Sequence, residues 1–383
     1  AASDVYKRQA MQLNESSNSP SDSASNSQST EASFDSSFAD LVNAPVQSLA
    51  QLWAKKYVKN LQASPDQEEV STSEGLHEVS SLAGRLQTIE KLNQSLRFAS
   101  AQAWSKTETL LVQEVQRHGI SADLIDPWQI AQDSRYLFEK TLEVYVEQSQ
   151  IDQITAHHSE TPTVIHAPGR LSVVIGPEVG KVRHTYTKKD PRVLGFVSMQ
   201  FHYTGQMLLD LLSPLERPLI SSYFKVIDDH LYMPLQRSYE AAAAHEYDSA
   251  ALVAVRQLLP ISSEIAVNIC QQVAQIYPDY RCHSGILSQP AIKVSTIRDV
   301  EMFQVYLCLC VLEGNIDALK QELFPLCVML YPPLNVSWGL IRNMLRLLGQ
   351  TLSDRLAPEQ MVAFRPYVRA LWEMFSEEIL PNN

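Results

Sequence analysis

The sequence is poor in cysteine, in long apolar runs and in basic charge. Its five cysteines all lie in the last third of the 383 residues, and such a sparse, odd set indicates free or buried thiols in a reducing compartment. The longest apolar run, Val305–Leu312, is far shorter than the roughly 20 residues of a membrane span. A net charge of -12 argues against nucleic acid as a partner, because phosphate binding needs a basic face. No segment resembles a secretory leader, so we expect a cytoplasmic protein without a transmembrane segment.

Catalytic and metal-binding motifs are also missing. The sequence has no HExxH, no Cys/His pairs at zinc spacing and no GxSxG elbow. The segment from Gly176 to Lys181 resembles a phosphate loop, but it has three residues between its glycines and Val182 after the lysine, so a β-turn is expected. Asp228-Asp229-His230 has the residue types of general acid–base chemistry, yet a solvated or partner-facing acidic stretch is the default interpretation. We predict neither an enzyme nor a metal site.

The N-terminal segment is rich in serine. Residues 1–9 resemble a translated sequencing adapter, and we expect either that the natural chain starts at Met11 or that it is truncated. Eleven of the 22 residues from Ser16 to Ser37 are serine, interleaved with other polar residues. Such a tract buries too little apolar area to offset its ordering entropy, so residues 1–37 are predicted to be a disordered tail.

A helical bundle is predicted for residues 38–150. Apolar residues at three- and four-residue spacings predict helices from Phe38 to about Leu61 and from about Leu82 to His118. Gly119 suits the C-terminal cap of the second helix, because glycine accepts the left-handed conformation. Asp126-Pro127 predicts the start of a third helix, with the aspartate as N-cap and the proline at the first helical position.

Residues 151–200 have a different pattern. Thr163–Ile165, Leu171–Ile175 and Val182–Tyr186 are β-branched or aromatic runs, and Pro168-Gly169 and Gly176-Pro177 separate them. Such runs with turn residues between them predict short strands. We therefore expect either a small β-hairpin insert or a structured linker here.

Residues 201–383 are predicted to be one helical domain. From about Phe196 the apolar pattern is helical again, and short connections between about seven helices indicate one compact unit. The expected helix breaks lie near Pro214, Pro234, residues 278–290, Gly314, Pro332-Pro333 and Pro358. The predicted fold class is therefore all-α, apart from the β-containing insert.

Within this domain, the stretch Thr296–Glu301 reads Thr-Ile-Arg-Asp-Val-Glu. It resembles the Cys-Leu-Arg-Asp-Met-Glu type stretch at the start of the pigment helix in phycobiliprotein subunits, and residues 213–378 as a whole resemble this family, the phycobilisome proteins or phycobiliprotein-like globins. That helix would end at Leu312–Asn315, where the family has Ala-Gly-Asp, and Leu334–Ser337 falls where it often has Leu-Gly-Val-Pro. Tyr232 and Ile261–Ile265 match upstream positions. The resemblance implies a globin-like domain.

The resemblance also identifies candidate site residues. The cysteine that binds the bilin in the family falls on Thr296, whose hydroxyl lacks the acidity and nucleophilicity that a thioether bond requires. Arg298 and Asp299 remain at the positions that face a propionate and the pyrrole N–H groups in the family. Cys282, in the preceding loop, is the alternative cysteine for a pigment. We expect no covalent cofactor, and non-covalent bilin binding stays open.

These features imply a non-pigmented phycobilisome-related protein. It would bind phycobiliproteins, phycobilisome linkers or a second copy of itself through apolar side chains of residues 213–232, in phycobilisome assembly, anchoring or regulation of light harvesting. The resemblance would place it in the cyanobacterial cytoplasm, peripheral to the thylakoid membrane. One alternative is a pigmentless globin module in stress signalling, with a regulatory partner or a fatty-acid-like ligand. Another is a bilin lyase-like protein in which Arg298 and Asp299 hold a bilin transiently.

Overall fold

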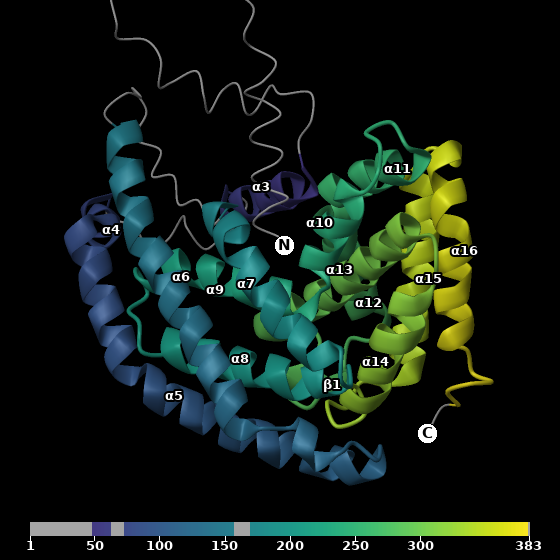
Figure 1. Ribbon diagram of the computed structural model, residues 1–383, viewed down its shortest axis with the longest axis horizontal. Helices are drawn as coiled ribbons and strands as arrows, with labels where there is room; N and C mark the ends of the chain where they lie inside the picture. The colour runs from purple at the N-terminus through teal and green to yellow at the C-terminus, as the bar shows by residue number, and fades with distance from the viewer. Residues whose placement is uncertain (1–47, 63–72, 157–168, 382–383) are drawn as a thin grey trace, which may run out of the picture. The chain divides into compact units, whose positions relative to one another are not determined.

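Helices make up almost all of the regular structure in residues 48–62, 73–156 and 169–381, the part of the chain that the computed structural model describes. The first half contains α3 (Leu49–Gln62), α4 (Ser73–Ser80), α5 (Leu82–Arg117), a 3₁₀ turn (Ala122–Leu124), α6 (Pro127–Ala156), α7 (Gly169–Thr187) and α8 (Val193–Leu209) (Figure 1). The predicted tail, residues 38–47 of the predicted first helix and the predicted strand Thr163–Ile165 lie outside the described residues.

The second half is helical too, except for one very short hairpin. It contains α9 (Arg217–Tyr232), α10 (Leu235–Ala243), α11 (Ala250–Leu258), a 3₁₀ turn (Leu259–Ile261), α12 (Ser262–Ile276), β1 (Arg281–Cys282), β2 (Gly285–Ile286), α13 (Pro290–Glu313), a π-helical turn (Ala318–Leu323), α14 (Phe324–Leu330), α15 (Trp338–Arg355) and α16 (Pro358–Met374). β1 and β2 pair antiparallel. The all-α class is confirmed, and the helix breaks lie where the prolines and Gly314 predict them.

Local sequence signals set several helix ends. The Asp126 carboxylate accepts hydrogen bonds from the backbone N–H groups of Trp128 and Gln129, at 3.0 and 3.2 Å, so it caps α6 as expected. Gly119 follows α5 with φ +59°, and Gly314 ends α13 with φ +68°. Glycine adopts this left-handed backbone without a Cβ penalty, so these two glycines terminate their helices.

The predicted strands between residues 171 and 186 are wrong. Leu171–Ile175 and Val182–Tyr186 both lie within α7, which also contains Pro177 and the segment expected to form a β-turn. The buried residues Leu171, Ile175 and Val179 follow one another at intervals of four, which is a helix face. Packing of that face against neighbouring helices has overridden the β preference of the branched side chains.

The glycines of α7 permit close helix packing. A Cβ on Gly180 would come within 2.6 Å of the Gln236 side chain of α10, and a Cβ on Gly176 would meet His230 of α9 at 3.4 Å. Glycine at these positions therefore lets α7 approach α9 and α10 closely. Sequence patterns assign such glycines to turns, because the partner helix is distant in sequence.

The described chain does not divide at residue 200. Residues 48–383 form one unit, and the boundary expected between residues 200 and 201 falls inside α8. α5 packs along α8 and α6, and α9 packs on α7, α8 and α6. The predicted bundle and the predicted C-terminal domain therefore share their helix contacts.

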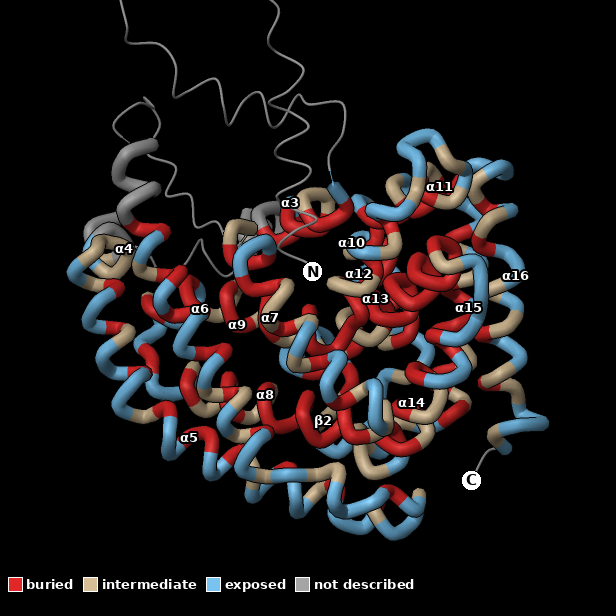
Figure 2. The backbone as a smooth tube through the Cα atoms, in the orientation of Figure 1, coloured by how far each residue is buried: buried red, intermediate tan, exposed pale blue. Residues whose placement is uncertain are grey.

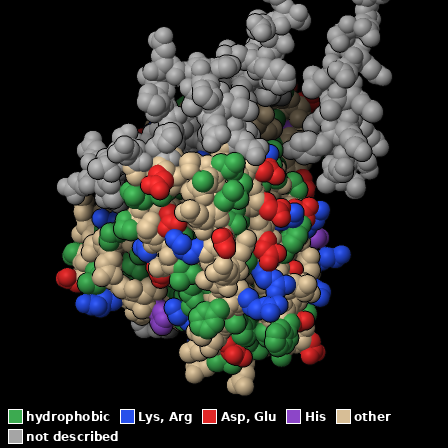
Figure 3. Space-filling model, turned by 90° about the vertical axis from the view of Figure 1, so that its left-hand side faces the viewer, with side chains coloured by type: hydrophobic (Ala, Val, Ile, Leu, Met, Phe, Trp, Pro, Cys, Tyr) green, Lys and Arg blue, Asp and Glu red, His purple; other side chains and the backbone are tan. Residues whose placement is uncertain are grey.

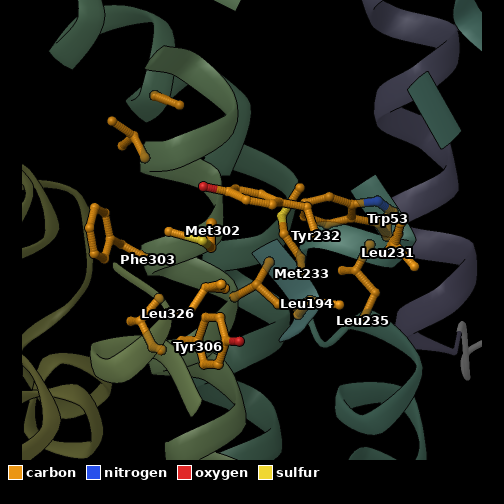
Figure 4. Close-up of a cluster of buried hydrophobic side chains, with 14 of the residues drawn as sticks. Trp53, Leu194, Leu231, Tyr232, Met233, Leu235, Met302, Phe303, Tyr306 and Leu326 are labelled. Carbon is orange, nitrogen blue, oxygen red and sulfur yellow. The ribbon is translucent and has the colours of Figure 1, made fainter. Parts of the chain in front are cut away.

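α13 is the central helix of the second half. Every residue from Val300 to Leu312 is buried, and α10, α11, α12 and α16 pack around it (Figure 2). A helix that is buried on all sides belongs to the interior of a core. In Figure 4, Trp53 of α3 lies in the same cluster as Leu231 of α9 and Met302 of α13, so the core is continuous from the first described helix onward.

Buried ion pairs also join α3 to the second half. The Lys56 ammonium lies 2.8 Å from the Glu301 carboxylate of α13 and 3.6 Å from the centre of the Trp53 ring. The Tyr57 hydroxyl donates to Asp229 of α9, at 3.0 Å. Charges removed from water are stable only when they are paired in this way. α3 is thus held by specific contacts as well as by apolar packing.

One described stretch, Ala250–Ile276, is long and apolar enough to cross a membrane by length and composition. It consists of α11, a 3₁₀ turn and α12, and 44% of its apolar window is buried inside the protein. Both helices pack on α13. A core helix passes the same test, so this stretch is weak evidence for a membrane span.

Candidate ligand crevice

A cavity of about 100 Å³ lies where α8, α9, the hairpin, α13, α14 and α15 meet. All four residues that the sequence identified, Thr296, Arg298, Asp299 and Cys282, line this cavity. Other polar side chains of its lining are Ser198, His202, Tyr232 and Ser295. Its apolar lining includes Met199, Leu287, Ile292, Leu330, Leu340 and Met344. We call this cavity the α13 crevice.

Thr296 lies in the wall of the crevice and is only 7% exposed. Its hydroxyl donates a hydrogen bond to the backbone carbonyl of Ile292, one turn earlier in α13, at 2.9 Å. The hydroxyl is therefore satisfied by its own helix. Thr296 is the residue on which the resemblance places the bilin cysteine, and this intrahelical hydrogen bond occupies its hydroxyl proton.

Arg298 is held in place by an ion pair and an aromatic ring. Its Nη1 lies 3.2 Å from Asp228 Oδ2, and its guanidinium carbon lies 4.3 Å from the centre of the Tyr232 ring. Burial lowers the pKa of Arg298, but the nearby carboxylates of Asp228 and Asp299 more than offset this effect, so the group stays charged. Its Nε is buried without a hydrogen-bond partner in the described residues.

Asp299 is a half-buried carboxyl group at the crevice. It accepts a hydrogen bond from the Tyr232 hydroxyl, at 2.9 Å. Loss of hydration raises the pKa of Asp299 to about 6, against the opposing effects of the Arg298 charge and of the Tyr232 hydrogen bond. The carboxyl group therefore changes its charge close to neutral pH.

Cys282 lies on β1 and is half-buried. Burial raises the pKa of its thiol, and the negative charge of Asp299 adds to this effect. A nucleophilic cysteine needs a lowered pKa and an electropositive surrounding. The raised pKa leaves Cys282 with a small thiolate fraction and makes it a slow nucleophile, although it lines the crevice as expected. The other four cysteines are buried: Cys270, Cys308, Cys310 and Cys327.

The crevice is small, and the charges of its lining are balanced. A cavity of about 150 Å³ holds one benzene molecule, so about 100 Å³ provides room for a single five-membered ring. Arg298 contributes one positive charge and Asp299, when ionised, contributes one negative charge, while Asp228, which pairs with Arg298, is not part of the lining. Because Arg298 is already paired, the Asp299 carboxylate is the acceptor for a ligand that presents an N–H group.

Sequence patterns did not identify several residues of this site. Ser198, Met199 and His202 belong to α8, where a linker was expected to end, and Tyr331 and Met344 belong to apolar helical stretches. No local pattern marks such positions, because distant helices meet there only through packing. Tyr232 was noted for its match to an aromatic position, but its contacts with Asp299 and Arg298 were not predicted.

The stretch Asp228-Asp229-His230 is not a solvated acidic surface, contrary to the expectation. Asp229 and His230 are fully buried, and only Asp228 reaches the Arg298 ion pair. His230 Nε2 lies 3.2 Å from the Ser172 hydroxyl, which has the residue types of a nucleophile and its base. Burial lowers the pKa of His230 to about 4, and Ser172 is itself buried, so this pair is part of the core.

The surface expected to receive a partner subunit is occupied by this chain. Apolar side chains of α9 that were expected to be available for docking pack against α6, α7 and α8. All of them are buried: Leu219, Ile220, Tyr223, Phe224, Val226 and Ile227. A second copy or a phycobiliprotein therefore finds no docking surface on this face of α9 in the folded chain.

No family model, no curated protein and no solved structure matches this chain. Within residues 48–62, 73–156 and 169–381, no group of three His, Cys, Asp or Glu side chains is placed to hold a metal ion.

Proposed function

We propose that this chain is a non-pigmented, phycobilisome-related protein that holds a bilin reversibly and without a covalent bond. The supporting observation is that the α13 crevice brings Thr296, Arg298 and Asp299 together, with a satisfied hydroxyl where a thiol would be needed. In this proposal one terminal ring of the bilin enters the crevice and donates its N–H to the Asp299 carboxylate. The protein would act in assembly, anchoring or regulation of the light-harvesting complex.

The pairing of Arg298 with Asp228 favours this function over the fatty-acid alternative. A fatty-acid-like ligand would bring a carboxylate to a site that already contains Asp299, while Arg298 is paired with Asp228. Two carboxylates at one site repel each other unless one takes up a proton. A lactam or pyrrole ring is apolar and donates an N–H, so it matches both the apolar lining and the acceptor.

The folded α9 face also favours pigment holding over direct docking. Partner binding through residues 213–232 would require α6, α7 and α8 to leave their places, with the loss of a large buried apolar area. In our proposal phycobiliproteins or linkers deliver or receive the bilin and contact another face of the chain. Such a role lies in the cytoplasm, peripheral to the thylakoid membrane.

A spectroscopic titration of the full chain tests the proposal. Purified protein is mixed with free phycocyanobilin, and the visible absorbance is followed to saturation. We expect a red-shifted, saturable band that is lost from the polypeptide after denaturation. Asp299→Asn should weaken binding about tenfold, because a charge-assisted hydrogen bond contributes about 1.5 kcal/mol or more. Asp354→Asn, on the exposed surface of α15, is the matched control and should leave binding unchanged. Absence of a saturable shift in the wild type would exclude the proposed function.

A further inference from the structure

A second hollow, of about 690 Å³, lies along one face of α5. Its volume is within the range of about 300 to 1,000 Å³ that is common for small-molecule sites. We call this hollow the α5 groove. It shares no lining residue with the α13 crevice, so it is a separate candidate site. In Figure 1, α5 passes beneath α8, and the two helices pack along each other.

The α5 side of the groove is polar. Lys106, Thr109, Gln113 and Arg117 follow one another at intervals of three and four residues, so they form one stripe on the helix surface. The stripe is about 16 Å long, because a helix rises by about 1.5 Å per residue. Among the α5 residues of the lining, Leu110 is the only apolar one. This side of the groove can therefore form several hydrogen bonds with one ligand.

Every other residue of the lining has a ring in its side chain. Tyr203 belongs to α8, His283 to the hairpin turn, and Pro332 and Pro333 to the segment between α14 and α15. The backbone N–H of His283 donates a hydrogen bond to the Leu334 carbonyl, at 2.8 Å, so the hairpin turn and the proline segment hold each other in place. The ring side chains thus present a preorganised surface against which a ring-shaped ligand can lie.

One positive charge in the groove has no carboxylate partner. The Lys106 ammonium lies 5.3 Å from the centre of the Tyr203 ring, and no carboxylate of the described residues forms an ion pair with it. The carboxylate of the lining, Glu114, is buried and lies 2.8 Å from Arg117, so these two charges cancel. The groove therefore attracts an anionic group, although the whole chain has a net charge of -12.

The two kinds of lining select the chemistry of the ligand. A purely apolar ring would leave the polar stripe of α5 without partners, and a small hydrated anion would leave the ring side chains uncovered. A sugar has a face of C–H groups and an edge of hydroxyl groups, so it matches both kinds of lining. An acidic group on that sugar completes the match, because Lys106 is the cation beside the Tyr203 ring.

We propose that the α5 groove binds an acidic sugar, whose ring lies against Tyr203 and whose anionic group pairs with Lys106. The hydroxyl groups of the sugar bind to the polar stripe of α5. A phosphate ester and a uronic carboxylate both supply such an anion, and they share the chemistry that Lys106 recognises. This site is independent of the proposed function, which uses the α13 crevice, and it gives α5 and α8 a binding role of their own.

Four small probes test the ligand: glucose 6-phosphate, glucuronate, glucose and inorganic phosphate. Each is titrated into the full-length protein, and its binding is followed by ligand-observed NMR. With the wild type we expect at least one of the two acidic sugars to bind with saturation, about fivefold or more tightly than glucose, as for an exposed charge pair. It should also bind more tightly than inorganic phosphate, which has no ring. The tighter of the two acidic sugars identifies the anion as a phosphate ester or a carboxylate.

Two pairs of variants separate the contributions of the charge and of the ring. Lys106→Gln should remove the preference for the acidic sugar over glucose, and Arg97→Gln, exposed on α5 nine residues earlier and outside the groove, should preserve it. Tyr203→Leu should weaken binding of the acidic sugar about threefold, and Tyr203→Phe, which keeps the ring, should not. Lys106 is exposed, so its substitution should leave the fold intact, and a far-ultraviolet circular dichroism spectrum equal to that of the wild type checks each variant.

Four results would overturn the acidic-sugar site. They are equal binding of glucose and both acidic sugars, equal binding of inorganic phosphate and the better acidic sugar, the same behaviour of Lys106→Gln and Arg97→Gln, and a lack of saturable binding for all four probes. None of these results changes the outcome of the bilin titration, so failure of this site and failure of the proposed function are distinguishable.

Discussion

The hydroxyl of Tyr232, at the end of α9, donates a hydrogen bond to the Asp299 carboxyl of α13, at 2.9 Å. The same Tyr232 ring lies 4.3 Å from the Arg298 guanidinium. One aromatic side chain thus orients both charged groups that the sequence identified. Because α9 is itself packed on α6, α7 and α8, the geometry of the crevice depends on the first half of the chain.

The raised pKa of Asp299 has a consequence for stability. Its folded pKa of about 6 lies above the ordinary value of 3.8, so the folded state binds the proton more tightly than the unfolded state. The carboxyl group therefore opposes folding once it ionises, and this cost grows as pH rises from about 4 to about 6. Asp299→Asn should remove a cost of up to about 3 kcal/mol at pH 8 and change little at pH 4.

Urea unfolding of the wild type and the variant at several pH values measures this difference. The difference in unfolding free energy between the two proteins is taken at each pH. The contributions of the other titrating groups cancel in it, since both proteins contain them. A variant that is no more stable than the wild type at pH 8 would show that Asp299 is well hydrated or better paired than its position indicates.

The buried ammonium of Lys56 should be essential for the docking of α3. Lys56→Met removes the partner of Glu301 and leaves Lys225, which is 3.9 Å from that carboxylate, as the remaining cation. Removing one member of a buried pair costs about 3 to 5 kcal/mol, and we expect the lower end of this range here. The measurement is the free energy of unfolding.

Two further variants test the cause of that loss. Lys55→Met changes the neighbouring, exposed lysine of the same helix and should cost less than about 0.5 kcal/mol. The double variant Lys56→Met with Glu301→Gln should recover part of the loss, because it removes the unpaired charge. Equal losses for Lys55→Met and Lys56→Met would contradict a specific role for the buried pair.

Two helical glycines should respond oppositely to alanine. In Gly180→Ala the new Cβ would come within 2.6 Å of the Gln236 side chain, so α7 and α10 must separate, at a cost of about 1 to 3 kcal/mol. In Gly349→Ala, in the interior of α15, the nearest atom is Val368 Cγ1 at 3.5 Å, an ordinary contact. That change should raise stability by about 0.5 to 1 kcal/mol through helix propensity. Thermal unfolding measures the stability of both variants. A Gly180→Ala protein more stable than the wild type would contradict the close approach of α7 to α10.

Helix ends were predictable from sequence, and helix neighbours were not. Asp126, Gly119 and Gly314 act through their own backbone, so their residue types were sufficient to place three helix ends. The β-branched runs of α7 misled the prediction, because their state depends on which distant helices cover them. A one-dimensional pattern contains no information about such partners.

In the candidate site, too, the residues that are close in sequence were predictable and the residues that folding brings together were not. Thr296, Arg298 and Asp299 lie within one turn of α13, so a short motif identified them together, and Cys282 was close enough to be included. His202 of α8 lies far away in sequence and reaches the crevice only after folding. The composition of the surface gave no signal for the site either. On the face drawn in Figure 3, acidic, basic and hydrophobic side chains are interspersed.

A cysteine at position 296 should convert reversible binding into covalent attachment. The Thr296 side chain lines the crevice, so a thiol there would lie beside the bound ring. Addition of the thiol across an exocyclic double bond of the bilin forms one S–C bond, places the thiol proton on the neighbouring carbon and needs no oxidant. Burial raises the pKa of the cysteines around this site, so we expect the addition to be slow at pH 7 and faster at pH 9.

Thr296→Cys protein incubated with phycocyanobilin should give a coloured band on a denaturing gel, and Thr296→Ser should give none. A coloured band from the wild type would mean that another side chain, with Cys282 the nearest, attaches the pigment. A colourless Thr296→Cys protein that still binds bilin reversibly would place the reactive double bond away from residue 296.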